Sequence, residues 1–130
     1  MAIRRRNAGI LAGTLVKCPA LRVTAPPEGI GHSHYNYYVF VLPERLKAEQ
    51  SRERIMAAIN EKGVPCFAGI CGEIYLERAF PEEWRPRERR RVARELGETS
   101  LMLVVHPTLS VEDMRYMGRM VEKVVTGATR

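Results

Sequence analysis

The segment 34–42 (HYNYYVFVL) limits the possible folds of this chain more than any other segment does. Aromatic and β-branched side chains favour extended backbone, and Pro43 ends the run, so the segment predicts a strand. Because alternate side chains of a strand face opposite ways, Tyr35 and Tyr37 are expected on one face and Tyr38 on the other. A strand needs partners, and we therefore expect the chain to contain a sheet.

The rest of the chain alternates between helical and extended patterns. Helices are predicted over 2–16, 48–62, 86–96 and from Ser110 onward, and shorter strands over 20–24, 64–67 and 101–105. Gly63 and Gly97 stand where the second and third helices should end. Pro65 cannot donate a backbone hydrogen bond, so its strand is expected at an edge of the sheet. This order predicts one α+β domain over residues 1–130, with a small, mostly antiparallel sheet packed by helices.

Side chains at spacings of three and four, apolar except for Asn7, define the face of each helix that should point inward. These residues are Ile3, Asn7, Leu11 and Leu15 in the first helix, Ile55, Met56 and Ile59 in the second, Val92 and Leu96 in the third, and Met114, Met117, Val121 and Val124 in the last. Ser110 and Asp113 predict a capping box for the last helix. The segment 69–85 is irregular, and Ala79, Phe80 and Trp84 are expected to anchor it to the core.

Basic residues outnumber acidic ones, with 21 Lys and Arg against 15 Asp and Glu and a net charge of +6. On a helix, Arg87, Arg90, Arg91 and Arg94 would share one face, and such a stripe could bind the phosphates of a nucleic acid. The alternative is a solvated helix face, because Glu88 and Glu95 interrupt the positive charge. Nucleic acid is therefore the less favoured partner, and a small basic nucleic-acid-binding module is the alternative function.

Three cysteines, Cys18, Cys66 and Cys71, do not form a disulfide framework, and a cytoplasmic location is the simplest interpretation. A zinc site is also disfavoured, because Cys66 and Cys71 are separated by four residues and no paired histidines follow. The chain lacks a run of 18 apolar residues and a secretory signal, so we expect neither a membrane span nor export.

Two regions contain residues suited to chemistry. His32, His34 and the neighbouring tyrosines gather where a loop meets the predicted strand, and histidine and tyrosine can transfer protons or bind phosphate. Half-buried strand aromatics would look the same. Residues 69–80 form a glycine-containing loop, and such loops often carry function, although a plain surface connection is equally compatible. Composition and periodicity do not identify a reaction for either region.

Several segments together, in this order and spacing, resemble the small domain of the DegT/DnrJ/EryC1/StrS aminotransferases. They are 5–8 (RRNA), 34–41 (HYNYYVFV), Arg54, 59–65 (INEKGVP), 71–80 (CGEIYLERAF), 84–86 (WRP), 93–102 (ARELGETSLM) and 106–110 (HPTLS). The resemblance covers nearly the whole chain. It implies the C-terminal lobe of a type I pyridoxal-phosphate enzyme.

The resemblance also implies an activity, a cofactor and partners. Members of this family transfer an amino group, often from glutamate, to keto-sugars on nucleotide carriers, for cell-surface polysaccharides or antibiotic sugars. They work as homodimers, and a large domain carries the lysine that binds pyridoxal phosphate. That domain would precede residue 1, and none of Lys17, Lys47, Lys62 and Lys123 has the family's serine-rich context. We therefore expect no catalytic, cofactor-binding or metal-binding residue here, and a chain that is inactive alone or simply a fragment.

Four residues are implied to bind substrate. Many family members have a Pro-Leu-His segment five residues before an aromatic, and its histidine borders the sugar site. Counting back from Phe80, Tyr75 takes the place of that histidine and Glu73 the place of the proline. His34 and Tyr35, at the start of the small domain, are the second pair. His106 and Pro107 are expected to be structural, turning the chain before the last helix.

Overall fold

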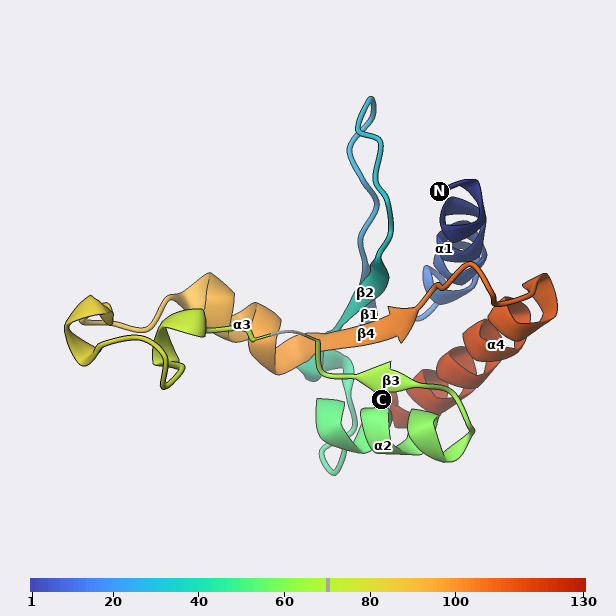
Figure 1. The fold of residues 1–130 in the computed structure, drawn as a ribbon. Helices are drawn as coiled ribbons and strands as arrows, with labels where there is room; N and C mark the ends of the chain where they lie inside the picture. The colour runs from blue at the N-terminus through green and yellow to red at the C-terminus, as the bar shows by residue number, and fades with distance from the viewer. Residues whose placement is uncertain (70) are drawn as a thin grey trace.

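The sheet lies at the centre of the computed structural model, which describes residues 1–69 and 71–130 (Figure 1). Within that part the sheet has four strands in the order β1-β2-β4-β3, and every neighbouring pair is antiparallel. The strands are β1 (Leu21–Val23), β2 (Asn36–Val41), β3 (Cys66–Phe67) and β4 (Ser100–Val104). The predicted α+β fold is confirmed, and so is the edge position of the strand that follows Pro65.

Three helices cover one face of the sheet: α1 (Ala2–Leu15), α2 (Arg52–Glu61) and α4 (Val111–Ala128). Helix α4 lies beside α1 and contacts α2, while α2 also packs on β3 and β4 (Figure 1). The alternating side chains of β2 and β4 that face these helices are buried, among them Val39 and Leu101 with no exposed surface. This layer forms the hydrophobic core, with a buried cluster from α1, α2, α4 and the sheet.

The ends of the core helices follow the predicted local signals. The Ser110 hydroxyl accepts the Asp113 amide at 3.1 Å, and an Asp113 carboxylate oxygen accepts the Ser110 amide at 2.8 Å, which completes the capping box. After α2, Gly63 has a φ of 72°, the left-handed conformation that favours glycine. The buried Asn7 amide donates to the His106 carbonyl at 3.0 Å, which ties α1 to the turn before α4. In α4, Val125 is buried and Val124 only partly so.

The third helix differs from the prediction. Helix α3 spans Arg91–Thr99, so it begins five residues later than expected and continues through Gly97. Gly97 permits close packing rather than ending the helix: a Cβ atom on Gly72 would lie 2.5 Å from the Gly97 Cα. The prediction that Val92 points inward is wrong, because its side chain is 61% exposed. Leu96 faces the sheet side as predicted, and Ala93 takes the place expected of Val92; both line a hollow there.

Residues 71–99, which we call the arm, project from the rest of the molecule (Figure 1). The arm contains two short 3-10 turns, Ile74–Leu76 and Glu82–Trp84, followed by α3. Trp84 is 68% exposed and does not anchor the arm to the core as expected, although its ring lies near that of Phe80. Ile70, which belongs to the irregular segment of the sequence, lies outside the described residues.

The connection between β1 and β2, residues 24–35, forms a second projection, which we call the β1–β2 loop (Figure 1). His34 has a φ of 48°, so the extended backbone predicted from residue 34 begins only at Asn36. Tyr35 consequently does not share a strand face with Tyr37: Tyr35 is 70% exposed and Tyr37 is buried. In the part of the chain that the structure describes, no helix is both long and apolar enough to span a bilayer.

Candidate functional site

Glu73 and Tyr75, the first predicted pair, lie together in the arm. The Tyr75 hydroxyl donates to Glu73 Oε1 at 2.5 Å and accepts the Arg90 backbone amide at 2.8 Å. Arg89 binds the same carboxylate with two nitrogens, and its Nε donates to Glu73 Oε1 at 3.0 Å. These contacts join the first turn of the arm to the residues just before α3. We call this group, Glu73, Tyr75 and Arg89, the arm clip.

The electrostatics of the arm clip favour an ionised carboxylate. Hydrogen bonds from Arg89 and then from Tyr75 lower the pKa of Glu73 to about 2. Burial and the neighbouring Glu73 raise the pKa of Tyr75, so its hydroxyl keeps its proton. Since the Tyr75 hydroxyl already donates one hydrogen bond and accepts another, the side chain can offer a ligand only the remaining lone pair of its oxygen and the face of its ring. The arm clip is therefore better suited to form a rigid surface beside a ligand than to donate a proton to it.

His34 and Tyr35, the second predicted pair, lie at the base of the β1–β2 loop. The His34 amide donates to His32 Nδ1 at 3.1 Å, and the two imidazole rings meet edge to face with centroids 4.4 Å apart. The His34 ring also lies 6.2 Å from the ring of Tyr37. Tyr35 is exposed, and the Arg4 guanidinium lies over its ring, 5.5 Å from the centroid.

The structure does not bring the two predicted pairs together. One pair belongs to the arm and the other to the β1–β2 loop, and these project in different directions (Figure 1). Among residues 1–69 and 71–130, no hydrogen bond, ion pair or aromatic contact joins Glu73 or Tyr75 to His34 or Tyr35. The domain thus presents two separate candidate sites.

Sequence reasoning missed the partners that complete both sites. Arg89 lies in the arginine-rich segment before α3, and its contact with Glu73, sixteen residues away, has no local signal in the sequence. Arg5, whose Nε donates to the His32 carbonyl at 3.1 Å, was treated only as part of the first helix. Tyr37 was one of the tyrosines noted beside His32 and His34, with a half-buried strand aromatic as the alternative, and its hydroxyl is buried without a hydrogen-bond partner among the described residues.

The arginine stripe is not formed. Because α3 begins at Arg91, Arg87 and Arg90 precede the helix and cannot share a helical face with Arg91 and Arg94, so that prediction is wrong. Several arginines of the arm are instead paired with glutamates: Arg94 Nε lies 2.7 Å from Glu98, and Arg85 lies 3.5 Å from Glu82. Such pairing weakens a continuous positive field.

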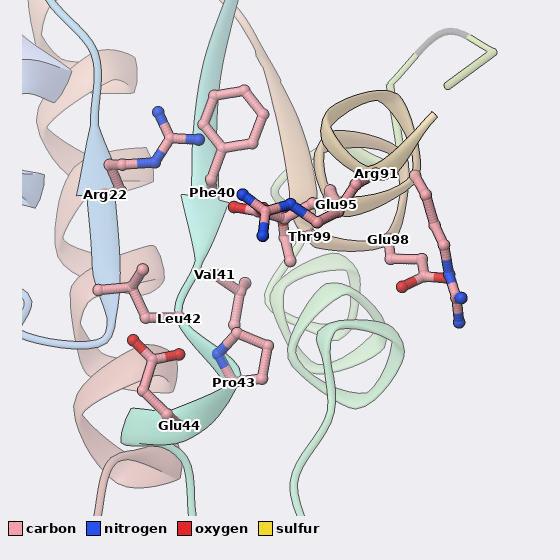
Figure 2. Close-up of a pocket in the computed structure, with 11 residues that line it drawn as sticks. Arg22, Phe40, Val41, Leu42, Pro43, Glu44, Arg91, Glu95, Glu98 and Thr99 are labelled. Atoms are coloured by element: carbon pink, nitrogen blue, oxygen red, sulfur yellow. The ribbon is translucent and has the colours of Figure 1, made fainter. Parts of the chain in front are cut away.

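A hollow of about 420 Å³ opens between the end of β2 and α3 (Figure 2). On its floor the Arg22 guanidinium lies over the ring of Phe40, 4.3 Å from the centroid. Charged side chains of both signs line the hollow, namely Arg22, Arg91, Arg94, Glu44, Glu95 and Glu98. The three positive charges face three negative ones, so this hollow has no strong preference for an anion.

The lysines of this chain do not fit a pyridoxal-phosphate site. Lys17, Lys47, Lys62 and Lys123 are all exposed, and the Lys47 ammonium donates to the Gly127 carbonyl at 2.7 Å. None of these four lines the hollow of Figure 2 or the hollows beside the β1–β2 loop. A Schiff-base lysine must be held inside a pocket with the substrate, and none of these four lysines is held in this way.

The fold is that of the C-terminal region of an aminotransferase. An aminotransferase from Psychrobacter cryohalolentis is 38% identical in an alignment covering 98% of this chain and 34% of that chain, with a TM-score of 0.91. The chain matches the C-terminal part of aminotransferases of the DegT/DnrJ/EryC1/StrS type. One such enzyme, from Brucella abortus, is 20% identical over 97% of this chain and 30% of its own, with a TM-score of 0.73.

A related fold also occurs in a dehydratase. The GDP-4-keto-6-deoxy-D-mannose-3-dehydratase of E. coli is 16% identical over 92% of this chain and 30% of its own, with a TM-score of 0.71. At this identity the likeness concerns the fold alone. This chain spans about a third of the length of the proteins that it matches. No protein-family model matches the sequence, and no curated protein is recognisably similar to it.

Proposed function

We propose that this chain is the C-terminal small domain of a pyridoxal-phosphate-dependent aminotransferase that acts on nucleotide-linked keto-sugars, in cell-surface polysaccharide or antibiotic sugar biosynthesis. The observation that carries the proposal is the match to the Psychrobacter enzyme over 98% of the chain with a TM-score of 0.91. The cofactor supplies an electron sink for amino transfer. It would be held by a large domain, so this domain is inactive alone.

The small domain would shape and close the sugar pocket. The arm clip supports this role, because it fixes the Tyr75 ring and the ionised Glu73 carboxylate in one rigid unit. His34 and Tyr35 would approach the substrate from the β1–β2 loop. Each of the two separate sites offers groups that can hydrogen-bond sugar hydroxyls: the Glu73 carboxylate in the arm, and the imidazole of His34 and the hydroxyl of Tyr35 in the β1–β2 loop.

Exposed apolar side chains in the arm support a partner domain. Large apolar side chains of the arm are exposed, namely Ile74, Leu76, Trp84 and Val92. Exposed apolar side chains concentrated in one region indicate an interaction surface. We infer that the large domain covers them and that the complete enzyme works as a homodimer in the cytoplasm, with the nucleotide-sugar as substrate. The paired arginines of the arm make a nucleic-acid partner the weaker alternative.

A chimera tests the proposal. This chain would replace the C-terminal third of the Psychrobacter aminotransferase, and a truncated enzyme without that third would be the control. We expect the chimera to bind pyridoxal phosphate and consume a nucleotide-linked keto-sugar with glutamate, whereas the truncated enzyme and the isolated chain do neither. A folded chimera that carries the cofactor but turns over no faster than the truncated enzyme would contradict the proposal.

A matched pair of variants tests the arm clip within the chimera. Tyr75→Phe removes the bond to the ionised Glu73 carboxylate and the bond from the Arg90 amide, and we expect the KM for the keto-sugar to rise roughly fivefold. Tyr116→Phe removes the same hydroxyl from another tyrosine, whose one hydrogen bond goes to the Lys62 carbonyl on the helix-covered side. We expect Tyr116→Phe to leave KM unchanged. Equal effects of the two variants would assign Tyr75 a purely structural role.

A further inference from the structure

Two adjoining hollows lie where the base of the β1–β2 loop meets α1. Their volumes are about 260 and 150 Å³, and both are lined by Thr24, Ala25, Pro26, His34 and Tyr37. We call them together the loop-base hollow. Pockets for drug-sized ligands have volumes of about 300–1,000 Å³, so each part fits a small ion or group rather than a whole nucleotide.

The loop-base hollow contains hydrogen-bond donors that lack acceptors. Tyr37 is only 3% exposed, and its hydroxyl has no partner in the part of the chain that the structure describes. Leaving a buried hydroxyl unsatisfied is costly, so an unpaired one that lines a hollow indicates a missing ligand. Arg5 donates through Nε to the His32 carbonyl, and its guanidinium makes no ion pair with any described carboxylate.

The charges that surround the hollow have one sign. Arg5 and His32 each line one of its parts, His34 lines both, and no aspartate or glutamate lines either among the residues described. Burial, then His32 and then Arg5 lower the pKa of His34, as expected where positive groups gather without a counter-charge. The left-handed backbone at His34 places its imidazole beside Tyr37.

The hollow of Figure 2 provides an internal comparison. It also contains arginines, but Glu44, Glu95 and Glu98 line it as well and supply the counter-charges. An anion entering that hollow would meet carboxylates, whereas an anion entering the loop-base hollow would meet none among the described residues and would find the Arg5 guanidinium and the Tyr37 hydroxyl there. The loop-base hollow is therefore the better anion site, although it is the smaller of the two.

We propose that the loop-base hollow binds a phosphate-class oxyanion, with the Tyr37 hydroxyl, the Arg5 guanidinium and the His34 imidazole as donors. Charge-assisted hydrogen bonds of this kind are stronger than neutral ones. The site does not depend on the proposed aminotransferase function, and it requires only this chain. If that function holds, the diphosphate of a nucleotide-sugar is one source of the oxyanion, and free inorganic phosphate is the other.

The test follows the three histidines by NMR while inorganic phosphate is added to the chain. We expect saturable shifts of the His34 imidazole and a pKa of His34 that rises by about half a unit or more, because a bound anion favours the imidazolium. His106, which lies at the turn before α4, is the internal control and should not respond. Linear, equal shifts of all three histidines would overturn the proposal.

Variants separate binding from folding. Arg5→Ala should weaken phosphate binding about tenfold, and Tyr37→Phe, which keeps the buried ring, should weaken it severalfold while the circular dichroism spectrum stays unchanged. Arg22→Ala, in the hollow of Figure 2, is the matched control and should bind phosphate normally. Normal binding by both Arg5→Ala and Tyr37→Phe would place the ion elsewhere and refute the site.

A second titration, with uridine diphosphate glucose, distinguishes the sources. Tighter binding of this probe than of inorganic phosphate would identify a nucleotide-linked diphosphate as the ligand, and equal or weaker binding would identify the free ion. Both measurements use the isolated chain without the cofactor. Failure of the chimera to transfer an amino group would therefore leave the oxyanion site standing, and failure of phosphate to bind would leave the proposed function standing.

Discussion

The two halves of this domain are built in different ways. Where α1, α2 and α4 cover the sheet, the side chains between them are almost fully buried, and Leu11, Ile59, Leu101 and Val121 have no exposed surface. In the arm, by contrast, Ile74, Trp84 and Val92 are each more than half exposed. Apolar burial therefore stabilises the helix-covered half, whereas the arm contributes little to it.

The arm is held by a few specific contacts instead. The arm clip joins its beginning to the residues before α3, and the contact between Gly72 and Gly97 joins its beginning to α3 itself through the two backbones. Such contacts fix a shape without burying much apolar area. The comparison indicates that the helix-covered half supplies the stability and the arm presents a surface, and the predictions below test this difference.

The largest expected difference concerns the reactivity of the cysteines. Burial raises the pKa of Cys18 to about 11 and that of Cys66 to about 12, and both lie in the core, whereas Cys71 is exposed in the arm. A hydrogen bond to Glu77 raises the pKa of Cys71, which slows its reaction only modestly. For a stability of about 5 kcal/mol, Cys18 and Cys66 should react roughly a thousandfold more slowly than Cys71.

The measurement uses a thiol reagent in excess, with mass spectrometry to identify the labelled residue. We expect one equivalent to react quickly in the native protein and all three in urea. Labelling of Cys18 or Cys66 at the rate of Cys71 would show that the core opens as readily as the arm, and the comparison of the two halves would fail.

Truncation of one large side chain in each half gives the next effect. Leu101→Ala removes a fully buried side chain and should lower the free energy of unfolding by about 3 kcal/mol. Trp84→Ala removes a larger but mostly exposed side chain and should change it by less than about 0.5 kcal/mol. Urea denaturation followed by circular dichroism measures both. A loss for Trp84→Ala as large as that for Leu101→Ala would mean that the arm belongs to the core.

The same division explains which parts of the fold could be predicted from sequence. The core elements are specified locally: apolar spacing defines α1, α2 and α4, and Gly63 and Ser110 set helix ends by their own chemistry. The aromatic and β-branched side chains of β2 predicted that strand on their own. These signals lie within a few residues of each other in sequence.

The arm is specified by contacts between residues that are distant in sequence. Gly97 resembles a helix stop in sequence, but its role depends on Gly72, twenty-five positions away. The start of α3 could not be predicted, because the arginines before it fit a helix by composition, and the contacts of Arg89 and of the Arg90 amide with the clip replace helical ones. Likewise, Glu73 and Tyr75 were identified through resemblance, whereas the roles of Arg89 and Arg5 required the structure.

Glycine-to-alanine substitutions in the two halves should have opposite effects. A Cβ atom on Gly127, in α4, would meet nothing within 4 Å, so Gly127→Ala should stabilise the protein by up to about 1 kcal/mol. A Cβ atom on Gly72 would lie 2.5 Å from the Gly97 Cα and force the two backbones apart, at a local cost of about 1–3 kcal/mol. Hydrogen exchange of the α3 amides should then accelerate about tenfold or more, while α4 stays protected. Unchanged exchange in Gly72→Ala would show that this glycine contact does not hold the arm.

The smallest effect is the response of the arm to acid. Glu73 has a folded pKa of about 2 against an ordinary value of 4.5, so its contribution to the ordering of the arm is fully present above pH 4.5 and is lost as the pH falls toward 2. Trp84 is the single tryptophan of the chain and lies in the arm, so its fluorescence reports on the arm alone.

We expect the Trp84 fluorescence of the unaltered chain to change between pH 4.5 and pH 2, and that of Glu73→Gln to stay nearly constant over this range. Glu98→Gln is the control: it removes only the exposed pair with Arg94, so its fluorescence should change as in the unaltered chain. Because protonation of Glu73 opens the clip without removing any buried apolar contact, circular dichroism of the core helices should not follow the change. A titration of Glu73→Gln identical to that of the unaltered chain would assign the acid response to another carboxylate and leave the clip without a role in ordering the arm.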